Sequence, residues 1–332
     1  MEVFRICGGP ELQGSVSVSG SKNSALPLFA ACLLSNEESI LENVPDLSDI
    51  RFMAQILNEL GADVEKLDQN TWRINPSAIT HSAPYELVRK MRASVCLLGP
   101  LVGRLKRAEI PMPGGCVIGN RPIDLHLRAM ERLGAQVKLE KGVIHVDAKD
   151  LKGNSIFMGG RHGSTVTGTA NVIMAASLAS GKTTIDSAAC EPEITDLCKM
   201  LKSMGAQIDG IGSHMIEIQG VKSLSGCRHR VIPDRIETAT YVLAAAITNG
   251  NVQIRDGRID HLGAFINVMS DSGVSVKQMD SNNLSVEVSP SGVKPFEAIT
   301  LPYPGFPTDL QAQTCALACR AEGLSILTER VY

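Results

Sequence analysis

The sequence has no run of about eighteen apolar residues, and its first residues lack a charged stretch followed by an apolar one. The first absence argues against a membrane-spanning helix, and the second argues against a signal peptide. The formal net charge is only -3, so the basic surface of a nucleic-acid-binding domain is not expected. Hydrophobic residues make up 44% and charged residues 20% of the 332 residues, which is typical of a soluble globular protein.

Metal-ligand spacing is also missing. The seven histidines are dispersed, and the nine cysteines are scattered, mostly in apolar runs. This pattern is typical of a reducing compartment, where thiols serve as small core residues, so we expect a cytoplasmic protein without a metal ion. Cys315 and Cys319 would face one way on a helix. Because no further ligand stands nearby, we expect them to pack in a core.

A segment of about seventy residues recurs along the chain. A helix-like run ends at a glycine and is followed by a short strand at Gly61, Gly134, Gly205 and Gly273. A second marker, a turn followed by a short apolar strand, appears at residues 40–41, 184–185, 252–254 and 325–327. Such self-similarity indicates symmetric copies of one supersecondary unit. The last marker lies close to Tyr332, so we expect the chain to end within a copy.

Each copy resembles strand, helix and strand with a further hairpin. In the first copy, residues 45–49 supply a helix start, and an apolar face follows at Phe52, Ile56, Leu57 and Leu60. Strands that alternate with helices of this kind predict an α/β (α+β) architecture in which helices cover sheets. The length predicts two domains. We expect a boundary near residues 230–233, where a strongly helical segment begins at Ile236.

The first segment whose residues could take part in binding or catalysis is Ser19–Pro27. It places Lys22 and Asn23 at the start of an apolar helix. A helix N-terminus presents unpaired N–H groups and a positive dipole end, so a lysine there favours an anion site. Ordinary helix capping with a solvated lysine is the alternative, and this segment alone does not exclude it.

The second segment is a loop rich in proline and glycine at residues 110–126. Cys116 stands at its tip between flexible glycines, and Arg121 follows. Adjacent positive charge lowers the pKa of a thiol, which makes Cys116 a candidate acid or nucleophile. Glycine hinges suit a lid that closes over a ligand. The alternative is a loop cysteine without a role.

The third segment is Tyr303–Gln313, in which Thr308 and Asp309 stand at a helix start behind a proline-rich approach. Asp309 is either a capping carboxylate or a base that faces a cleft.

Together these segments resemble the UDP-N-acetylglucosamine 1-carboxyvinyltransferases, the MurA family of enolpyruvyl transferases in the EPSP synthase superfamily. Four motifs carry the resemblance: Gly20–Asn23, Pro113–Pro122, Pro233–Thr238 and Phe306–Gln313. The resemblance implies that an enolpyruvyl group moves from phosphoenolpyruvate to the 3-hydroxyl of UDP-N-acetylglucosamine, with release of phosphate. This is the first committed step of peptidoglycan and cell-wall synthesis. It further implies a cytoplasmic monomer with two small-molecule substrates, no metal or organic cofactor, and no nucleic-acid or membrane partner.

The fold implied by the resemblance is a two-domain inside-out α/β barrel, in which each domain is a pseudo-threefold arrangement of one repeated unit. Applied to this sequence, it predicts a complete three-unit domain at residues 22–232. Residues 1–21 and 233–332 would form the second domain. Because the family continues beyond Tyr332, we expect that second domain to be incomplete at its C-terminus.

The resemblance also implies roles for single residues. Lys22 is expected to contact phosphoenolpyruvate, Asn23 the sugar nucleotide, and Arg92 and Arg121 the diphosphate or phosphoenolpyruvate. Cys116 matches the lid thiol that adds to phosphoenolpyruvate and that fosfomycin alkylates, and Asp309 matches the base that takes the proton of the sugar hydroxyl. Further substrate-lining positions are Asp124, Leu125, Thr165, Val166, Glu191, Asp234, Glu237, Thr308 and Val331.

Two alternatives stay open. The shikimate-pathway enolpyruvyl transferase, EPSP synthase, shares the fold, but the Gly-Gly-Cys lid at residues 114–116 argues against it. The other alternative is a non-catalytic, truncated paralogue that binds the UDP-sugar.

Overall fold

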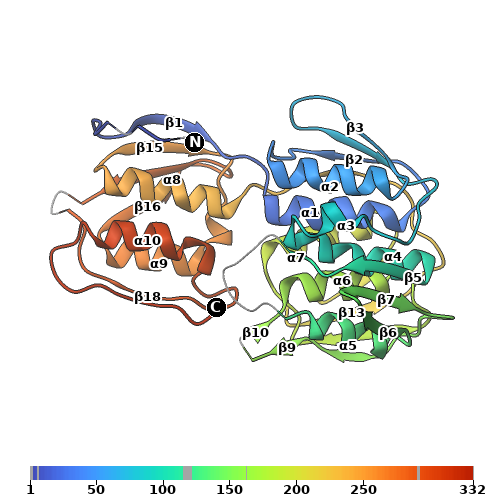
Figure 1. Ribbon diagram of the computed structural model, residues 1–332. Coiled ribbons are helices and arrows are strands. Elements are labelled where there is room, and N and C mark those ends of the chain that lie inside the picture. The colour runs from blue at the N-terminus through green and yellow to red at the C-terminus, as the bar shows by residue number, and fades with distance from the viewer. Residues whose placement is uncertain (1–2, 6, 115–121, 162, 290–291, 332) are drawn as a thin grey trace. The chain divides into compact units, whose positions relative to one another are not determined.

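The structure is a computed structural model that describes residues 3–5, 7–114, 122–161, 163–289 and 292–331. The chain forms two compact units. Unit 1 comprises Met1–Ser19 and Pro233–Val331, and unit 2 comprises Gly20–Ile232. Both units contain helices and strands (Figure 1), which confirms the predicted α/β class.

Within the described residues, unit 2 repeats one arrangement three times: an inner helix, a strand, an outer helix and a hairpin. The first copy consists of α1 (Lys22–Ala31) with η1 (Cys32–Leu34), β2 (Ser39–Glu42), α2 (Ser48–Glu59), β3 (Asp63–Lys66) and β4 (Trp72–Asn75). After α3 (Tyr85–Val88), the second consists of η2 (Arg92–Leu97), α4 (Leu98–Leu105), β5 (Arg107–Pro111), α5 (Asp124–Arg132), β6 (Gln136–Glu140) and β7 (Val143–Asp147). After β8 (Ser155–Phe157), β9 (Gly159–Gly160) and β10 (Gly163–Ser164), the third consists of α6 (Val166–Ala176), β11 (Lys182–Asp186), α7 (Pro192–Ser203), β12 (Gln207–Asp209) and β13 (Met215–Gln219).

The sheets of unit 2 follow the same repeat. Their strand orders are β14-β2-β4-β3, β5-β7-β6 and β12-β13-β11-β8, where β14 is Arg228–Arg230. The strand after each inner helix pairs in antiparallel fashion with the last strand of its copy. On its other side it meets a parallel neighbour, which is β14 for β2 and β8 for β11. For β5 this neighbour is a single parallel bridge between Ser82 and Glu109.

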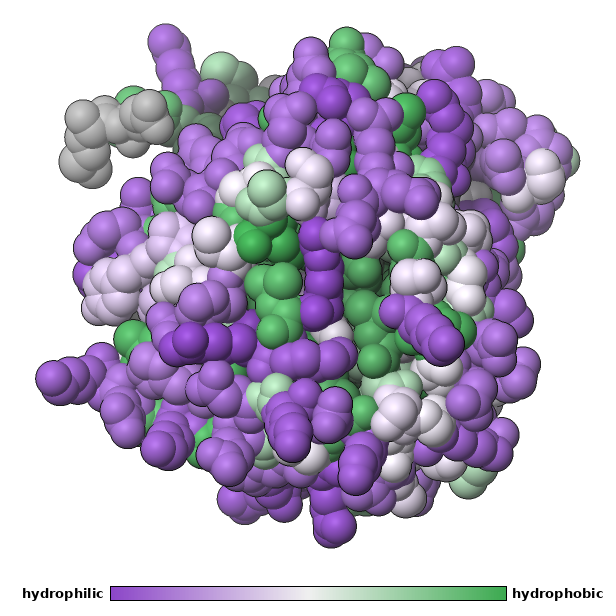
Figure 2. All heavy atoms as spheres, turned by 90° about the vertical axis from the view of Figure 1, so that its right-hand side faces the viewer, coloured by the Kyte–Doolittle hydropathy of each residue, from purple (hydrophilic) through white to green (hydrophobic). Residues whose placement is uncertain are grey.

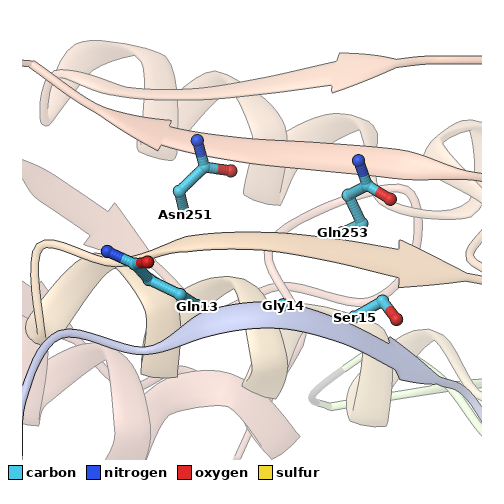
Figure 3. Close-up of a pocket in the computed structure, with 5 residues that line it drawn as sticks. All are labelled: Gln13, Gly14, Ser15, Asn251 and Gln253. Atoms are coloured by element: carbon cyan, nitrogen blue, oxygen red, sulfur yellow. The ribbon is translucent and has the colours of Figure 1, made fainter.

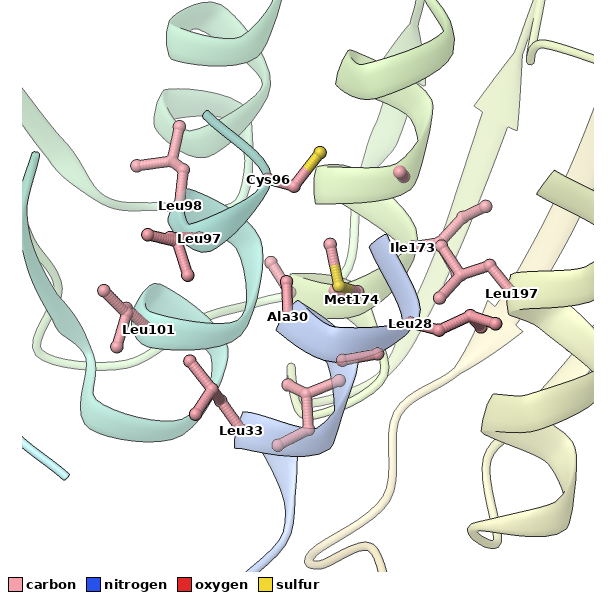
Figure 4. Close-up of a cluster of buried hydrophobic side chains, with 14 of the residues drawn as sticks. Leu28, Ala30, Leu33, Cys96, Leu97, Leu98, Leu101, Ile173, Met174 and Leu197 are labelled. Carbon is pink, nitrogen blue, oxygen red and sulfur yellow. The ribbon is translucent and has the colours of Figure 1, made fainter. Parts of the chain in front are cut away.

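The inner helices of unit 2 are apolar on nearly all sides, as expected for helices that are buried in a core. Figure 4 shows side chains of α1, η1, η2–α4, α6 and α7 packed together. The labelled ones are Leu28, Ala30, Leu33, Cys96, Leu97, Leu98, Leu101, Ile173, Met174 and Leu197. All ten side chains are buried in the core of unit 2. On the face of the molecule shown in Figure 2, hydrophilic side chains dominate and apolar ones gather near the middle.

Unit 1 uses the same plan around its own core. Its elements are β1 (Gln13–Ser17), α8 (Arg235–Ile247), β15 (Asn251–Arg255), η3 (Ile259–His261), α9 (Gly263–Asp271), β16 (Val274–Gln278), β17 (Leu284–Val288), β18 (Glu297–Ile299), η4 (Thr308–Leu310), α10 (Gln311–Ala318) and β19 (Ile326–Thr328). The sheet order is β1-β15-β17-β16, with β1 parallel to β15, and β18 pairs in parallel with β19. Phe265 and Phe306 meet in the core with ring centroids 6.1 Å apart.

The predicted repeat is visible in the backbone. Each outer helix ends next to a glycine with positive φ, a conformation that side chains with a Cβ rarely adopt. The φ values are 101° at Gly61, 99° at Gly134, 103° at Gly205 and 82° at Gly273. Three of the predicted strand markers lie within β2, β11 and β15, and the fourth, at residues 325–327, overlaps β19. The predicted helix at Ile236 is α8.

The expected packing of Cys315 and Cys319 is wrong. Both are exposed on α10, because Thr314 and Leu317 provide the buried side of that helix. By contrast, Cys32, Cys96 and Cys198 are buried, as the apolar runs around them predict. Among the described residues, no helix has both the length and the apolar character needed to cross a bilayer.

Candidate active site

The inner helices of unit 2 run parallel and begin at one end. Gly99 of α4 lies against Asn171 of α6, and Gly103, one turn later, lies against Ala175, also one turn later. Gly103 also meets the side chain of Leu34, at the end of the segment that α1 begins. Because the three C-terminal ends meet there, the starts of α1, η2–α4 and α6 lie together at the opposite end.

The outer helices of unit 2 begin at the same end. On α1, Lys22 Nζ lies 3.7 Å from Asp49 Oδ2 of α2, and Ser24 Oγ donates to Asp196 Oδ2 of α7 at 2.6 Å. Between α5 and α6, His126 Nε2 and Thr167 Oγ1 are 3.3 Å apart. All of these residues lie within the first turns of their helices. Six helix starts therefore form what we call the N-terminal face of unit 2, where the positive ends of the helix dipoles favour anions.

The described unit 2 residues that the sequence singled out all lie on this face. They are Lys22 and Asn23 in α1, Arg92 in η2, Asp124 and Leu125 in α5, Thr165 and Val166 at the start of α6, and Glu191 before α7. The fold thus brings together residues from five parts of the chain. Cys116 and Arg121 lie outside the described residues.

Lys22 is the first residue of α1, directly after a capped helix start. The Ser21 hydroxyl accepts a hydrogen bond from Ser24 N at 3.3 Å, which satisfies one of the free N–H groups of the first turn. The Lys22 side chain is 42% exposed and faces Asp49. A lysine therefore stands at a capped helix start, partly open to solvent, where an anion would find both an ammonium group and a positive dipole end.

His126 is a buried neutral group close to Arg92. Its Nδ1 lies 2.9 Å from Asn171 Nδ2, which can only donate, so Nδ1 accepts and Nε2 carries the proton toward Thr167. Burial, together with the positive charge of Arg92, lowers the pKa of His126 to about 4. Arg92 is therefore the charged member of this pair at neutral pH.

Asp196 forms hydrogen bonds that connect the region where α1 and α7 begin. The carboxylate is 2% exposed and accepts from the Ser24 hydroxyl. It also lies 2.9 Å from His229 Nε2 and accepts from Ile232 N at 3.3 Å. Burial of a carboxylate is tolerated here because both of its oxygens have partners.

In unit 1, α8 and η4–α10 also begin at one end. Gln313 Nε2 donates to Thr240 Oγ1 at 3.1 Å. The two residues lie equally far from the first residues of η4–α10 and α8, Thr308 and Arg235. Asp234 caps α8, since its Oδ1 accepts from the backbone N–H groups of Ile236 at 2.8 Å and Glu237 at 3.1 Å. Glu237 Oε2 in turn accepts from Ser19 N at 2.8 Å.

Glu329 connects two further predicted residues of unit 1, Thr308 and Val331. Its Oε2 accepts from the Thr308 hydroxyl at 2.8 Å. Its Oε1 accepts from the Thr300 hydroxyl and from Val331 N, both at 2.6 Å. Asp309 is the exposed second residue of η4, whose cap residue is Pro307. Asp234, Glu237, Thr308, Asp309 and Val331 thus lie at what we call the N-terminal face of unit 1.

Four side chains that organise these faces were not predicted from the sequence: His126, Asn171, Asp196 and Glu329. Asn171 could have been noticed, because it is a single amide within the apolar stretch of α6. The others carry no local signal, since their partners are distant in the sequence.

Two hollows on the described surface lie away from these faces. One lies over β1 and β15 and is lined by Gln13, Gly14, Ser15, Asn251 and Gln253 (Figure 3). The other lies around Tyr85, Glu109 and His145. The helix starts, unlike these hollows, combine cations, positive dipole ends and the predicted residues. No cluster of three or more metal-ligating side chains occurs in the described part of the chain.

Comparison with known proteins gives a consistent result. The sequence model of the EPSP synthase (3-phosphoshikimate 1-carboxyvinyltransferase) family matches residues 6–332. A UDP-N-acetylglucosamine 1-carboxyvinyltransferase of Methylacidiphilum infernorum is 48% identical over 333 residues, which cover 100% of this chain and 78% of the relative. The protein of the same name from Helicobacter pylori is 46% identical over 337 residues, with the same coverage of both chains.

Solved structures share the fold. The enolpyruvyl transferase NikO from Streptomyces tendae superposes with a TM-score of 0.88 at 24% identity, covering 98% of this chain and 77% of that one. An EPSP synthase from Acinetobacter baumannii gives a TM-score of 0.68 at 18% identity, covering 96% and 74%. At these identities the likeness concerns the fold alone.

Proposed function

The chain belongs to the EPSP synthase family and, within it, to the UDP-N-acetylglucosamine 1-carboxyvinyltransferases, and we propose that the N-terminal faces of its two units hold the substrates of that reaction. The enzyme transfers the enolpyruvyl group of phosphoenolpyruvate to UDP-N-acetylglucosamine in peptidoglycan synthesis. The observation that supports this function is the sequence identity of 44–48%, along the entire chain, with relatives of this name. EPSP synthase activity is less supported, since the solved EPSP synthase is similar in fold at only 18% identity.

On the N-terminal face of unit 2, Lys22 and Arg92 would supply fixed positive charge for two anionic substrates. Arginine offers a planar fork that matches phosphate and carboxylate oxygens, and lysine offers a point charge. Asn23, Asp124, Leu125, Thr165, Val166, Glu191 and Arg121 would complete the unit 2 lining. The free N–H groups of the surrounding helix starts add to this attraction.

On the N-terminal face of unit 1, Asp309 would act as the base. It takes the proton of the sugar 3-hydroxyl while the hydroxyl oxygen bonds to C2 of phosphoenolpyruvate, and an acid delivers a proton to C3. Loss of the C3 proton and of phosphate then restores the double bond. Cys116 is the group proposed for covalent addition to phosphoenolpyruvate or for proton delivery. Asp234, Glu237, Thr308 and Val331 would line the sugar.

We further propose that the enzyme works in the cytoplasm as a monomer, without a metal ion or organic cofactor. Its partners would then be the two small-molecule substrates alone. The near-neutral net charge of -3 is in keeping with the absence of a nucleic-acid partner.

The test is release of inorganic phosphate from phosphoenolpyruvate in the presence of UDP-N-acetylglucosamine. Asp309→Asn should lower the turnover rate by roughly a hundredfold or more, because a base is removed, while calorimetric affinity for UDP-N-acetylglucosamine stays close to that of wild type. Asp271→Asn, at an exposed position on α9, is the matched control. Phosphate release with shikimate 3-phosphate instead would establish the EPSP synthase reaction. Binding of the sugar nucleotide without turnover would establish the non-catalytic paralogue.

A further inference from the structure

Asn171 lies in the second turn of α6 and is fully buried. Its Oδ1 accepts from Gly99 N of α4 at 2.7 Å. Its Nδ2 donates to Val95 O of η2 at 2.9 Å and to His126 Nδ1 of α5 at 2.9 Å. Both amide N–H groups and the carbonyl oxygen of the side chain therefore have a partner, one each on η2, α5 and α4. A carboxamide is the side chain that can make this set of bonds, because it donates twice and accepts.

The backbone packs tightly around this amide. A Cβ atom at Gly99 would lie 2.5 Å from the Asn171 carbonyl oxygen and 2.9 Å from Oδ1. Such distances are too short for any real contact, so only glycine lets α4 approach α6 closely enough for the Gly99 N–H to reach Oδ1. The hydrogen bonds and the close approach depend on one another.

The segments that Asn171 joins carry predicted nucleotide-binding residues. These segments are short helices that have little stability of their own. Arg92 opens η2, a six-residue 3-10 helix, and Asp124 opens α5, a nine-residue helix. Neither helix has a side-chain cap at its start. Short helices without caps are marginal alone, so their position depends on tertiary contacts. Val95 lies one turn after Arg92, and His126 lies two residues after Asp124.

We propose that Asn171 is a positioning residue for the sugar-nucleotide site on the N-terminal face of unit 2. It fixes the starts of η2 and α5 relative to α6, and through them it sets where Arg92, Asp124 and Thr165 meet the UDP moiety. Asn171 does not touch the ligand, since it is fully buried. The role rests on the proposed function, because it presupposes that UDP-N-acetylglucosamine binds on this face.

The experiment compares Asn171→Ala with Ser177→Ala by calorimetric titration with UDP-N-acetylglucosamine. Ser177 is equally buried at the end of α6, but its hydroxyl donates to Ile173 O of its own helix at 2.8 Å. Asn171→Ala should weaken binding per folded molecule by about tenfold, because misplaced groups lose most of their contribution. Ser177→Ala should bind as wild type. Circular dichroism gives the folded fraction at the titration temperature.

His126→Leu is the second variant, for the case that Asn171→Ala does not fold. It removes the contacts that α5 makes with Asn171 and Thr167 but keeps the bonds of Asn171 to η2 and α4. Because His126 is only 2% exposed, the change removes no ligand contact. It should weaken binding by a smaller factor, about threefold, since one of three links is lost. Wild-type affinity in the folded fraction of these variants would overturn the positioning role. Failure of the wild type to bind would instead overturn the proposed function.

Discussion

Ser24 Oγ donates to Asp196 Oδ2 at 2.6 Å and thereby joins the first turn of α1 to the first turn of α7. Both side chains are buried, at 0% and 2% exposure. His229 and the Ile232 N–H bind the same carboxylate. Lys22, Asn23 and Glu191, which lie within a few residues of this junction, are therefore held by a buried polar network rather than by loops. A network of this kind stabilises only while every member has its partner.

Asp196→Asn should therefore lower the free energy of unfolding by about 2–4 kcal/mol, because a buried charge-assisted acceptor is replaced by a group that presents N–H to donors. Denaturant unfolding measures this change. Trp72 is the single tryptophan and packs against Phe29 of α1 with ring centroids 5.7 Å apart, so its fluorescence reports on unit 2. Asp209→Asn, at an exposed position in β12, is the control and should be neutral. Equal stability of the two variants would contradict the argument.

The buried neutral His126 should make stability depend on pH. Burial lowers its folded-state pKa from 6.5 to about 4, so below pH 6.5 the unfolded chain takes up a proton that the folded chain refuses. The contribution of neutral His126 to the free energy of unfolding is complete above pH 6.5 and is lost as the pH falls toward 4. At about 1.4 kcal/mol per pKa unit, the loss is on the order of 3 kcal/mol.

The comparison of wild type with His126→Gln isolates this effect from all other titrating groups. The variant should be less stable at pH 7 but should lose less stability than wild type between pH 7 and pH 4. Parallel curves for the two proteins over that range would show that His126 is protonated in the folded state. The free energy of unfolding at each pH comes from urea titrations followed by Trp72 fluorescence.

Glu329 should matter for turnover although it is far from Asp309 in sequence. Its carboxylate accepts from Thr308, Thr300 and Val331, so it holds the start of η4 against the end of β19. Glu329→Ala should lower the turnover rate by about tenfold, because the carboxylate of Asp309 loses its fixed position. Glu322→Ala, at an exposed position without this network, should leave the rate unchanged. Steady-state rates of phosphate release decide between these outcomes.

The sequence predicted features that depend on a few neighbouring residues. The glycine turns at Gly61 and Gly205 follow from the need for positive φ after a helix, and the apolar face of α2 follows from its spacing. Strand β5 was not predicted, although Arg107 and Glu109 alternate with buried residues, because the prolines and glycines from Pro111 onward indicated a loop that begins at residue 110. Periodicity alone therefore gave the repeat but not each of its strands.

Features that depend on tertiary packing could not be predicted. Spacing places Cys315 and Cys319 on one face of a helix, but it does not tell which face meets the core, and Leu317 lies on the buried one. Asn171 and His126 are 45 residues apart, and only the packing of α5 on α6 brings them into contact. The roles of Lys22 and Asp309 came from resemblance, since a helix start alone does not distinguish a cap from a site.

Cys116 should be the thiol that fosfomycin alkylates. Burial raises the pKa of Cys96 and of Cys198 to about 12, so these thiols remain protonated and unreactive at neutral pH. The exposed competitors are Cys7, Cys315 and Cys319.

Intact-protein mass spectrometry should show one adduct on wild type and on the Cys315→Ala, Cys319→Ala double variant, and none on Cys116→Ala. Cys116→Asp should keep an acid at the tip of the loop and therefore retain phosphate release in the presence of the inhibitor. Labelling of Cys116→Ala at the wild-type rate would identify another thiol as the target. In that case the catalytic assignment of Cys116 would fail, while that of Asp309 would stand, because its test uses turnover and not alkylation.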